Sequence, residues 1–562
     1  MKKIPYGLSE FQEIKLDNYY YVDKTRFIPL IENLPRYLFF IRPRRFGKSL
    51  FISMLHYYYD EKYKDKFEEI FKDTWILENR TDLANKFKIL RFNFSEVDST
   101  RYEESFHHHI DIVIDNFVKN YKLAIRFNSS NPLEKLSELF RQKKELNIYC
   151  LIDEYDNFAN ELLSKEKIEY EHLVKGQESI FKHFFKILKS ATDMERGPLK
   201  RLFITGVTPM VMFDVTSGFN IGDFATNNPY LNSMLGFTRQ EVEKILEYYE
   251  IEPNFEFLNS WYDNYRFSED VEERIYNSDM IWHYVKSWVY TGKPPKELAD
   301  LNIRTNYGKL KWLVYTGERL NGNFNVLERI IKGETITTLK IKDAFSAFEL
   351  IDEDNFISLM YYLGLLTIED KKLKLGLTLP NNTIKEIIAE YIKKILESRN
   401  IFKISLNKFS DKLAEFALNG RLEVFRFLGE KIKESTSIRD YIKGEQTIKA
   451  IHLTYLNLCD YYFVISEPEL NKKFADIVLY PRNQYVEYVA LIELKYLKRS
   501  VEHKLQSPIQ ESSITNLINE AKSQLNESEQ DEKVRYWIDQ GRKLKKIIIV
   551  YYGWELVYLE SV

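Results

Sequence analysis

The chain has 562 residues, which is long enough for three or four domains. Lys and Arg number 81 against 84 Asp and Glu, so nucleic-acid binding cannot rest on global charge and would need a local basic patch. The two cysteines, Cys150 and Cys459, lie in or beside apolar runs, and their spacing fits neither a disulfide framework nor a zinc site. No run reaches about 20 apolar residues and no apolar segment follows the N-terminal lysines, so we expect a cytoplasmic protein without a membrane partner.

The order of apolar runs and helical patterns predicts an α/β protein with several parts. Short apolar runs alternate with helical patterns over residues 1–235, as they do in α/β domains. The pattern of residues 236–345 predicts a helical lid region, and that of residues 346–400 predicts a winged-helix-like or small helical unit. From residue 401 to residue 562, helices lead into three strongly apolar strands, which predicts a second α/β domain.

The stretch FFIRPRRFGKSLF, residues 39–51, ends like a phosphate-binding loop. Gly47 would allow the close turn, Lys48 would reach the β- and γ-phosphates, and Ser49 would bind magnesium. A glycine is expected five residues before Gly47, but the chain has Arg42 there. From these residues alone, an ATP site and a basic turn between a strand and a helix both remain open.

A second run, IYCLIDEYD, supplies an apolar strand that ends in acid. Asp153 would hold magnesium through water, and Glu154 would polarise the attacking water. The alternative is a strand followed by an acidic helix N-cap. Together with the loop, in this order and about a hundred residues apart, the run favours a nucleotide site. A further strand ends near Thr205, whose hydroxyl could sense the γ-phosphate or simply cap a turn.

Five segments together resemble the AAA-ATPase-like family: YVDKTRFI, IRPRRFGKSLFISML, LIDEYDN, FITGVTP and LGFTRQEV. The resemblance covers roughly residues 3–235 and implies that an arginine at position 42 is the family's normal pattern. Asp23 and Lys24 match the family's DKT segment, which we expect near the nucleotide. The nucleotide-binding residues that we then expect are Arg42, Arg44, Arg45, Phe46, Gly47, Lys48, Ser49, Asp153 and Thr205.

A second set of charged residues lies in the C-terminal part. Glu493 and Lys495 are two apart on a strand, so their side chains point to the same face. A neighbouring strand can bring Asp476 beside Glu493. Two carboxylates can hold one or two Mg²⁺ ions, and the lysine can position a water, which is the inventory for phosphodiester hydrolysis. The alternative is a Glu–Lys pair on a half-exposed strand, which the apolar flanks VALIELKYL make less fitting.

Residues from about 440 to 560 resemble the PD-(D/E)XK nuclease superfamily. The resemblance implies that the helix in GEQTIKAIHLTYLNL contributes an upstream acid, Glu445, as a third metal ligand, and that the helix in NEAKSQL carries Gln524. Where the family often has a glycine-rich turn with arginine before the aspartate, this chain has Asn471 and Lys473. The geometry of that turn is therefore left open.

The sequence as a whole predicts a P-loop ATPase with ATP and Mg²⁺ as cofactors, joined to a Mg²⁺-dependent nuclease that its nucleotide state gates. Glu154, Asp476, Glu493 and Lys495 are the expected catalytic residues, and Ser49, Asp153, Glu445, Asp476 and Glu493 are the expected metal ligands. The expected partner is nucleic acid, DNA before RNA, with a homo-oligomer left open and a role in defence or mobile elements implied by family analogy alone. The alternative is a nucleotide-switched binding or signalling module whose nuclease-like domain is inactive.

Overall fold

The chain folds into two compact units. The first comprises Met1–Leu310 and Thr337–Thr383, and the second comprises Lys311–Ile336 and Ile384–Val562. The four domain ranges expected from the sequence are finer than this division and stay predictions. The structure is a computed structural model that describes residues 1–157, 180–192, 197–210, 221–295, 297–298, 313–316, 319–369, 374–398, 400–435, 444–467, 469–470, 473–499 and 511–562.

A parallel five-stranded sheet forms the centre of the first unit. Its strands are β1 (Tyr37–Ile41), β2 (Lys88–Asn93), β3 (Ile148–Asp153), β4 (Leu199–Gly206) and β5 (Asp223–Phe224), in the spatial order β2-β3-β4-β1-β5. β1 and β3 are buried almost throughout, as their continuous apolar runs predict for a sheet covered on both faces. Because β4 lies between β1 and β3, the carboxyl ends of these three strands meet at one edge of the sheet.

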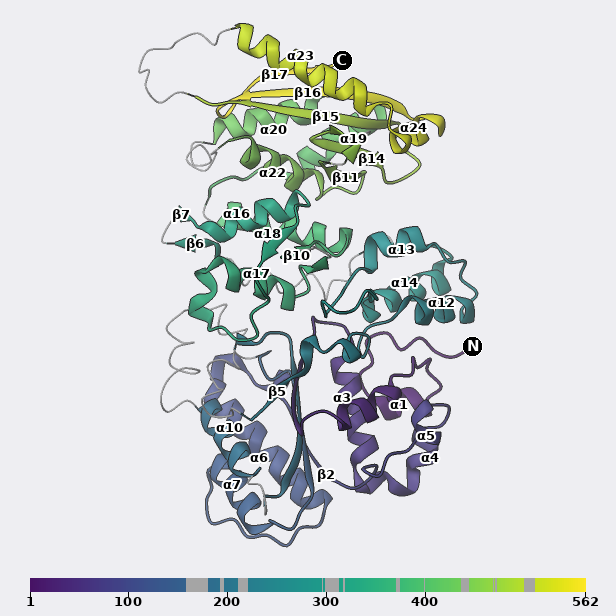
Figure 1. The fold of residues 1–562 in the computed structure, drawn as a ribbon, viewed down its shortest axis with the longest axis vertical. Coiled ribbons are helices and arrows are strands. Elements are labelled where there is room, and N and C mark those ends of the chain that lie inside the picture. Colours follow the sequence, from purple (N-terminus) through teal and green to yellow (C-terminus); the bar gives the residue numbers. More distant parts are fainter. Residues whose placement is uncertain are drawn as a thin grey trace. The chain divides into compact units, whose positions relative to one another are not determined.

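Helices cover both faces of this sheet (Figure 1), with α6, α7 and α10 on one side and α1 and α3 on the other. The helix α7 shows how the sequence specifies them. The Asn131 side chain caps it by accepting two backbone N–H groups, Pro132 occupies its first position, and Leu133, Leu136 and Leu139 form its buried stripe. The helices around the sheet are α1 (Phe11–Leu16), α2 (Ile28–Glu32), α3 (Lys48–Tyr59), α4 (Phe67–Ile70), α5 (Trp75–Glu78), α6 (Tyr102–Asn120), α7 (Pro132–Gln142) and α10 (Ile180–Ser190).

The rest of the first unit is a group of helices and a small sheet. β9 and β10 form an antiparallel hairpin, with β8 on the far side of β10. A capping box begins α12, because the Thr238 hydroxyl and the Glu241 carboxylate each accept the other residue's backbone N–H. The elements are α12 (Arg239–Tyr248), α13 (Phe255–Tyr262), α14 (Ser278–Thr291), β8 (Ile336–Thr338), α17 (Glu353–Tyr362), β9 (Thr367–Glu369) and β10 (Leu375–Thr378).

The second unit is built on a mixed five-stranded sheet in the order β11-β14-β15-β16-β17. β15 and β16 are parallel, and the other neighbours are antiparallel. The sheet strands are β11 (Tyr462–Ser466), β14 (Ile477–Pro481), β15 (Tyr488–Leu497), β16 (Lys543–Tyr552) and β17 (Glu555–Ser561). The short strands outside it are β6 (Tyr315–Thr316), β7 (Arg319–Leu320), β12 (Glu469–Leu470) and β13 (Lys473–Phe474).

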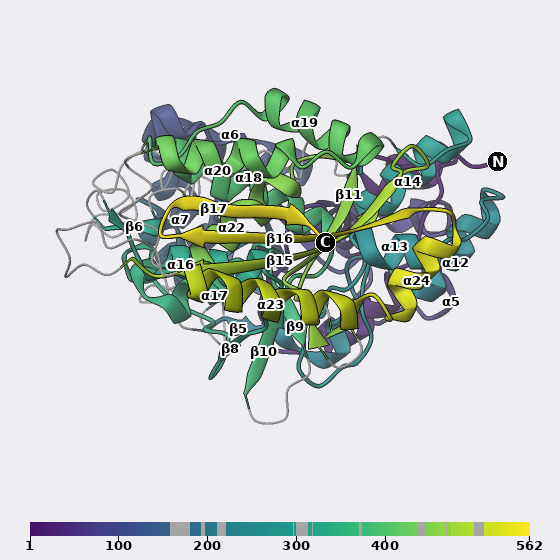
Figure 2. The same ribbon diagram turned by 90° about the horizontal axis from the view of Figure 1, so that it is seen from above.

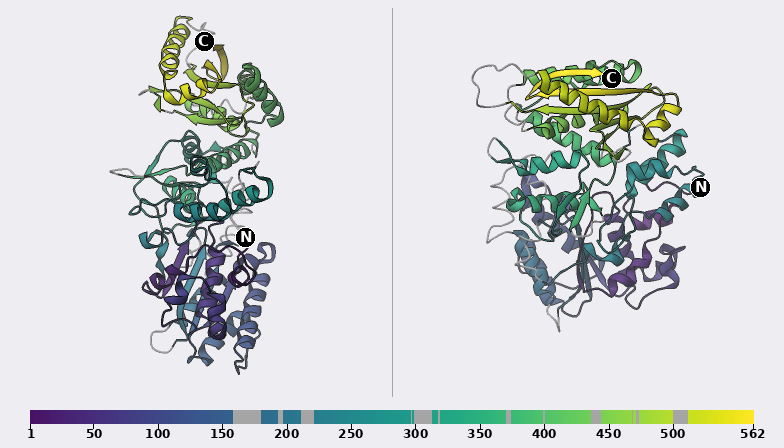
Figure 3. Two further views of the ribbon diagram at one scale, coloured as in Figure 1. Left: turned by 90° about the vertical axis from the view of Figure 1, so that its right-hand side faces the viewer. Right: turned by 45° about the horizontal axis from the view of Figure 1, so that its top comes forward.

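Helices pack on both sides of this second sheet. The sheet lies between α23 on one side and α19 and α20 on the other (Figures 2 and 3). Leu491, Ile548 and Val550 of the strands pack with Ala521 and Leu525 of α23 in one buried core. The helices of this unit are α16 (Gly322–Ile331), α18 (Asn382–Ser398), α19 (Leu406–Asn419), α20 (Glu423–Glu434), α22 (Glu445–Leu456), α23 (Glu511–Ser528) and α24 (Glu532–Asp539).

A search of the described part of the chain for a helix long and apolar enough to cross a membrane found none. The predicted α/β class, with a parallel sheet in the N-terminal part and an α/β domain at the C-terminal end, is confirmed.

Gly206 marks a close approach between the ends of β3 and β4. A Cβ atom on it would lie 2.4 Å from Asp156 Oδ1 and 2.5 Å from the Tyr155 ring, closer than real contacts allow. We expect Gly206→Ala to destabilise the first unit by about 1–3 kcal/mol, because a packed site cannot absorb the added methyl group. Thermal unfolding measures the loss.

Gly322→Ala is the matched control, since nothing lies within 4 Å of the Cβ position there. A melting temperature for Gly206→Ala equal to that of the control would contradict the packing described.

Candidate functional site

The loop from Arg42 to Gly47 connects β1 to α3 with two left-handed residues. Arg45 has φ 67° and Gly47 has φ 94°. A glycine at position 47 adopts this conformation without the steric cost of a Cβ atom. The loop therefore opens α3 directly behind a buried strand, so that the helix N-terminus and the loop's N–H groups can face an anion.

Lys48 holds the loop together from inside. Its ammonium donates to the carbonyl oxygens of Arg42 at 3.0 Å and Pro43 at 2.9 Å, and the residue is only 7% exposed. Burial lowers the pKa of Lys48 to about 8, although the nearby carboxylates of Glu154 and Asp153 favour the charged form. Among the described residues, the Lys48 ammonium thus donates hydrogen bonds to neutral carbonyl groups of the loop.

Asp153 is the last residue of β3 and Glu154 follows it, at the same edge of the sheet. The Asp153 carboxylate is 1% exposed, and the nearby Ser49 hydroxyl favours its charged form. Burial raises the pKa of both carboxyl groups. Glu154 has φ 50°, an uncommon conformation for this residue type, and its N–H donates to Asp153 Oδ1 at 3.0 Å. The structure brings together the residues that the two motifs predicted.

Asp156 is a buried residue of this region that the sequence reasoning missed. Its carboxylate accepts the N–H of Val207 at 3.1 Å, the N–H of Thr208 at 2.7 Å and the Thr208 hydroxyl at 2.9 Å. Tyr155 adds a bond from its hydroxyl to the Thr208 carbonyl. These contacts fasten the loop after β3 to the loop after β4 and so position Glu154. The sequence signal that could have identified Asp156 was its position as a second aspartate three residues after Asp153.

The position of Arg42 differs from the expected one. Its guanidinium is 1% exposed, donates to the carbonyl oxygens of Thr226 at 2.7 Å and Leu231 at 3.1 Å, and lies between the rings of Phe40 and Phe267, 4.2 Å from each centroid. Burial lowers its pKa to about 9. The side chain is therefore turned into the protein interior, where it anchors the loop, and does not add charge beside the phosphates in this structure.

Thr205 lies at the end of β4, as the strand pattern predicted. Its hydroxyl is buried and donates to the Phe40 carbonyl of β1 at 2.7 Å. In this structure the hydroxyl joins two strands, and its expected contact with the γ-phosphate stays a prediction.

The other loop residues contact the beginning of α14. The Arg45 carbonyl accepts the Ser278 hydroxyl at 3.1 Å and the Asp279 N–H at 3.4 Å, and the Arg45 guanidinium lies 4.0 Å from the Asp279 carboxylate. The buried Phe46 ring lies edge-on to nearby aromatic rings, and its carbonyl accepts the Gly236 N–H at 3.0 Å. The loop is therefore held by α14 on one side and by Gly236 on the other.

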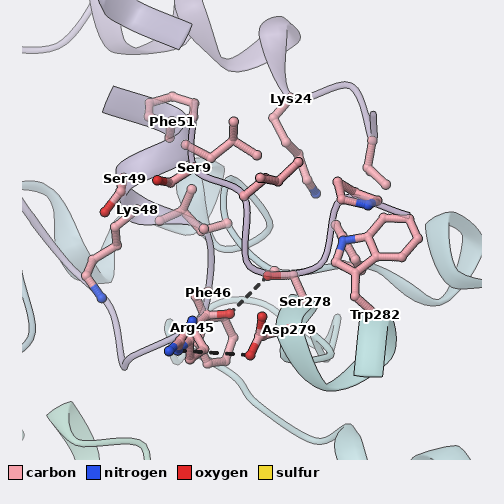
Figure 4. A pocket seen from close by; sticks show the side chains of 18 of the residues that line it. Ser9, Lys24, Arg45, Phe46, Lys48, Ser49, Phe51, Ser278, Asp279 and Trp282 are labelled. Atoms are coloured by element: carbon pink, nitrogen blue, oxygen red, sulfur yellow. Dashed lines mark hydrogen bonds and ion pairs between the residues drawn. The ribbon is translucent and has the colours of Figure 1, made fainter. Parts of the chain in front are cut away.

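A cavity of about 520 Å³ opens beside the loop. Figure 4 shows Lys48 and Ser49 on one side of it and Lys24 and Trp282 on the other. The volume is within the range of small-molecule sites. The cavity combines charged groups at the loop with an apolar, aromatic region. Its lining includes Pro5, Leu8, Tyr20, Tyr21, Lys24, Arg44, Arg45, Phe46, Gly47, Lys48, Ser49, Phe51, Glu154, Met234, Phe237, Ser278, Asp279 and Trp282.

The DKT segment contributes to this cavity, as the resemblance implied. Lys24 lines it, and its ammonium lies 2.9 Å and 2.6 Å from the two carboxylate oxygens of Glu241, the acid of the α12 capping box. Asp23 accepts the Thr25 hydroxyl at 2.7 Å and so fixes the turn. The segment thus ties the N-terminal residues to α12.

The residues present fit ATP and Mg²⁺. The Ser49 hydroxyl and the Asp153 carboxylate are adjacent oxygen ligands of the kind that Mg²⁺ prefers. Burial disfavours the charged form of the Asp153 carboxylate and raises its pKa. A cation bound beside it would stabilise that charged form. Lys48 and Arg44 both line the cavity and supply the positive charge that phosphate groups need.

The second centre lies where β14 and β15 diverge. The Asp476 N–H donates to Glu493 Oε2 at 3.2 Å, and the Leu494 N–H donates to Asp476 Oδ2 at 2.8 Å. The two carboxylates are therefore neighbours, as predicted. Burial, followed by the charge of Asp476, raises the pKa of Glu493.

Lys495 and Gln524 also lie where the resemblance placed them. The Lys495 ammonium contacts Glu493 Oε1 at 3.2 Å and Gln524 Oε1 at 2.8 Å. Glu445 is the first residue of α22, and burial together with the charge of Asp476 raises the pKa of Glu445. Asn471 lies outside the described residues, so the departure from the family's turn is not described there.

Lys449 and Glu467 are the charged neighbours that the sequence reasoning missed. The Lys449 ammonium is 1% exposed and lies 2.9 Å from Asp476 Oδ1 and 2.7 Å from Glu467 Oε1. Burial lowers the pKa of Lys449, but the two carboxylates outweigh this effect and leave it raised. The i, i+4 spacing from Glu445 along α22 was the available signal.

The donor set fits a divalent cation, which Asp476 and Glu493 would hold together with a substrate phosphate. Within the described ranges, no three Asp, Glu, His or Cys side chains gather closely enough to hold a metal ion. The expected role of Glu445 as a third ligand beside Asp476 and Glu493 stays a prediction, and burial and the charge of Asp476 together raise the pKa of Glu445. Mg²⁺ is commonly held by one or two carboxylates plus substrate phosphates and water, so two carboxylates suffice.

Comparisons with known proteins find one family model in the N-terminal part of the chain and another in the C-terminal part. Residues 5–216 match the family model described as predicted AAA-ATPase, and residues 443–561 match the model of the PD-(D/E)XK nuclease superfamily. A protein of Azotobacter chroococcum mcd 1, described as an uncharacterized protein in the vnfD 5' region, is 26% identical over 305 residues. Those residues are 52% of this chain and 55% of that protein, so the chain spans about half the length of this relative.

The different placements of Arg42 and Arg44 lead to a test. Arg42→Ala leaves buried carbonyl groups without their donor, at a cost of about 1–3 kcal/mol for each such group. We expect it to lower the melting temperature by several degrees, since about 2–4 °C are lost per kcal/mol in a domain of this size. Differential scanning calorimetry of the ligand-free protein measures the shift.

Arg44→Ala is the matched variant, because Arg44 lines the cavity and is only half-buried. It should leave the melting temperature unchanged and weaken ATP binding. Equal melting temperatures for the two variants would contradict the anchoring role of Arg42.

Proposed function

We propose that this chain, in which a predicted AAA-ATPase domain is followed by a PD-(D/E)XK nuclease superfamily domain, binds and hydrolyses ATP and cuts nucleic acid, with nucleotide state gating the cut. The observation that carries the proposal is the convergence of Lys48, Ser49, Asp153 and Glu154 at one edge of a parallel sheet. DNA is the substrate that we propose before RNA.

The geometry supports ATP binding through the chain's own groups. The phosphates would lie against the loop and the N-terminus of α3, where Lys48 can exchange its neutral carbonyl partners for charged oxygens. The base would enter the aromatic end of the cavity near Trp282 and Phe237. Mg²⁺ bound by Ser49 and Asp153 would neutralise the charge that develops on the phosphates.

Glu154 is the group that we assign to the attacking water. It lines the cavity beside Lys48, and burial has raised its pKa, so its carboxylate is a stronger base than an exposed one. Asp156 holds the loop on which Glu154 sits. Glu154 would therefore accept the proton of the water, and Asp156 would position Glu154.

In the second centre, Lys495 is the group that we assign to the water that attacks the phosphodiester. A divalent cation bound by Asp476 and Glu493 would lower the pKa of bound water and offset charge on the scissile phosphate. Lys495 contacts Glu493 and Gln524, which orient its ammonium toward that water. The proposed ATP site and the proposed nuclease centre belong to one chain. ATP binding could therefore change the cleavage rate by shifting the chain between two conformations.

The second candidate is a nucleotide-switched binding module with an inactive nuclease-like domain. One observation favours it: the Lys449 ammonium already engages the Asp476 carboxylate. Cleavage assays with plasmid, linear and single-stranded substrates, with and without Mg²⁺, decide between the two candidates.

The lowered pKa of Lys48 predicts how ATP affinity changes with pH. Below about pH 8 the ammonium is already charged in the free protein, so affinity should be constant. Above pH 8 the free amine must take up a proton to pair with the phosphates, so affinity should fall by up to about tenfold per pH unit. Isothermal titration calorimetry from pH 7.5 to 9.5 measures the slope.

Lys48→Arg is the control, since its guanidinium keeps its charge over this range. Its ATP affinity should be independent of pH whatever its absolute value. The same slope in wild type and in Lys48→Arg would mean that another group takes up the proton.

Replacing Glu154 should separate binding from turnover. Glu154→Gln keeps the shape and removes the charge, so ATP should still bind while phosphate release falls by about 100-fold or more. Release of inorganic phosphate is the measurement. Glu145→Gln, at an exposed position before β3, should behave like wild type. Wild-type turnover in Glu154→Gln would place the base elsewhere.

The nuclease centre predicts a division between metal binding and cleavage. Asp476→Ala and Glu493→Ala should lose both, because they remove the two ligands. Lys495→Ala should keep Mn²⁺ and nucleic-acid binding, but its cleavage rate should fall by about 100-fold or more. It removes only the group that handles the water. Plasmid nicking and Mn²⁺ titration are the measurements.

Lys533→Ala, at an exposed position in α24, is the matched lysine control and should cut at the wild-type rate. Cleavage that survives both carboxylate substitutions would refute the assignment of this centre.

A further inference from the structure

The surroundings of Asp476 contain a buried cation that the proposed nuclease chemistry does not use. The Lys449 ammonium lies between two carboxylates, 2.9 Å from Asp476 Oδ1 and 2.7 Å from Glu467 Oε1. A cation between two carboxylate oxygens is the arrangement in which a divalent ion would bridge them. Here the chain itself supplies that charge.

The local backbone is arranged to keep this contact. Glu467 follows β11 in a left-handed conformation, with φ 47°, which is uncommon for a residue with a Cβ atom. Its N–H donates to the Asp476 carbonyl at 3.0 Å, so the two acids are fixed relative to each other from opposite strands. Lys449 reaches them from α22 with 1% of its side chain exposed.

The other side of Asp476 remains directed at Glu493. Asp476 Oδ2 accepts the Leu494 N–H at 2.8 Å, and Glu493 Oε2 accepts the Asp476 N–H at 3.2 Å. Lys495 in turn contacts Glu493 from the α23 side. Asp476 and Glu493 thus adjoin, and among the described residues no lysine is recorded in contact with both of them.

We propose that Lys449 acts as a built-in cation that bridges Asp476 and Glu467, so that this centre takes one divalent ion rather than two. The inference rests on the proposed nuclease function and specifies its metal content. Lys449 is a positioning residue, because it acts on the metal site through Asp476. Removing its charge opens the Asp476–Glu467 pair to a second ion, since two adjoining carboxylates without a counter-ion attract one.

The test counts Mn²⁺ ions bound by the full-length protein without nucleotide, by electron paramagnetic resonance titration. Asp476→Ala supplies the background of ions bound elsewhere in the chain. Above this background, wild type and Lys449→Arg should bind one ion per chain. Lys449→Met, which keeps the length of the side chain but not its charge, should bind two. Lys449→Met combined with Glu467→Gln should return to one.

Two ions above background in wild type, or one or none in a folded Lys449→Met variant, would overturn the proposal. The number of Mn²⁺ ions bound by wild type tests the proposal even if Lys449→Met does not fold. One ion above background supports a single metal site, and two ions contradict it. No Asp476-dependent ion in wild type would instead refute the proposed metal centre itself. Failure of the inference and failure of the proposed function are therefore distinguishable.

Discussion

The Arg42 guanidinium anchors the loop between β1 and α3, on which the proposed nucleotide site depends. It donates hydrogen bonds to the Ile41 carbonyl at the end of β1 and to the carbonyl groups of Thr226 and Leu231. It also packs against the aromatic ring of Phe267, so it joins segments that are distant in sequence. A guanidinium can serve several carbonyl groups at once because its donors lie in one plane. Its removal from water is costly, so the surrounding acceptors must stay in place. The loop geometry at Gly47 and Lys48 follows from this anchor.

Both proposed centres use lysines that the fold has removed from water. Lys48 is held by neutral carbonyl groups, and burial dominates its pKa, so it is ready to exchange those partners for phosphate oxygens. Lys449 is held by two carboxylates that outweigh burial, so it stays where it is. The same side chain is therefore an exchangeable ligand-binding group in one unit and a fixed counter-ion in the other, according to the charge of its partners.

The sequence predicted the elements better than it predicted the side-chain contacts. The apolar runs placed β1, β3 and β4 correctly, and the two-residue spacing of Glu493 and Lys495 placed both side chains on one face of β15. The Arg42 side chain points into the protein interior because it contacts Thr226 and Phe267. These residues are far away in sequence, so a local pattern could not predict the contacts. Asp156 and Lys449 were missed for the same reason, since their partners become neighbours only when the strands pair.

Motif spacing also could not reveal how the centres are completed. The family resemblance implied Glu445, at the start of α22, as a metal ligand, but it did not reveal that Lys449, one turn later, contacts Asp476. The contact between Arg45 and α14 depends on the Asn277 cap, which lies more than 200 residues from the loop. Local patterns thus specify strands, caps and facing residues, whereas charge pairing across the fold requires the structure.

The gating claim is tested most directly by the rate at which the protein nicks supercoiled plasmid in Mg²⁺, with and without ATP. We expect ATP to change the wild-type rate by about tenfold or more, which corresponds to a coupling free energy of about 1.4 kcal/mol. Lys48→Ala should cut at the ATP-free rate under both conditions. Equal wild-type rates with and without ATP, for a protein that binds ATP and cuts plasmid, would contradict the account.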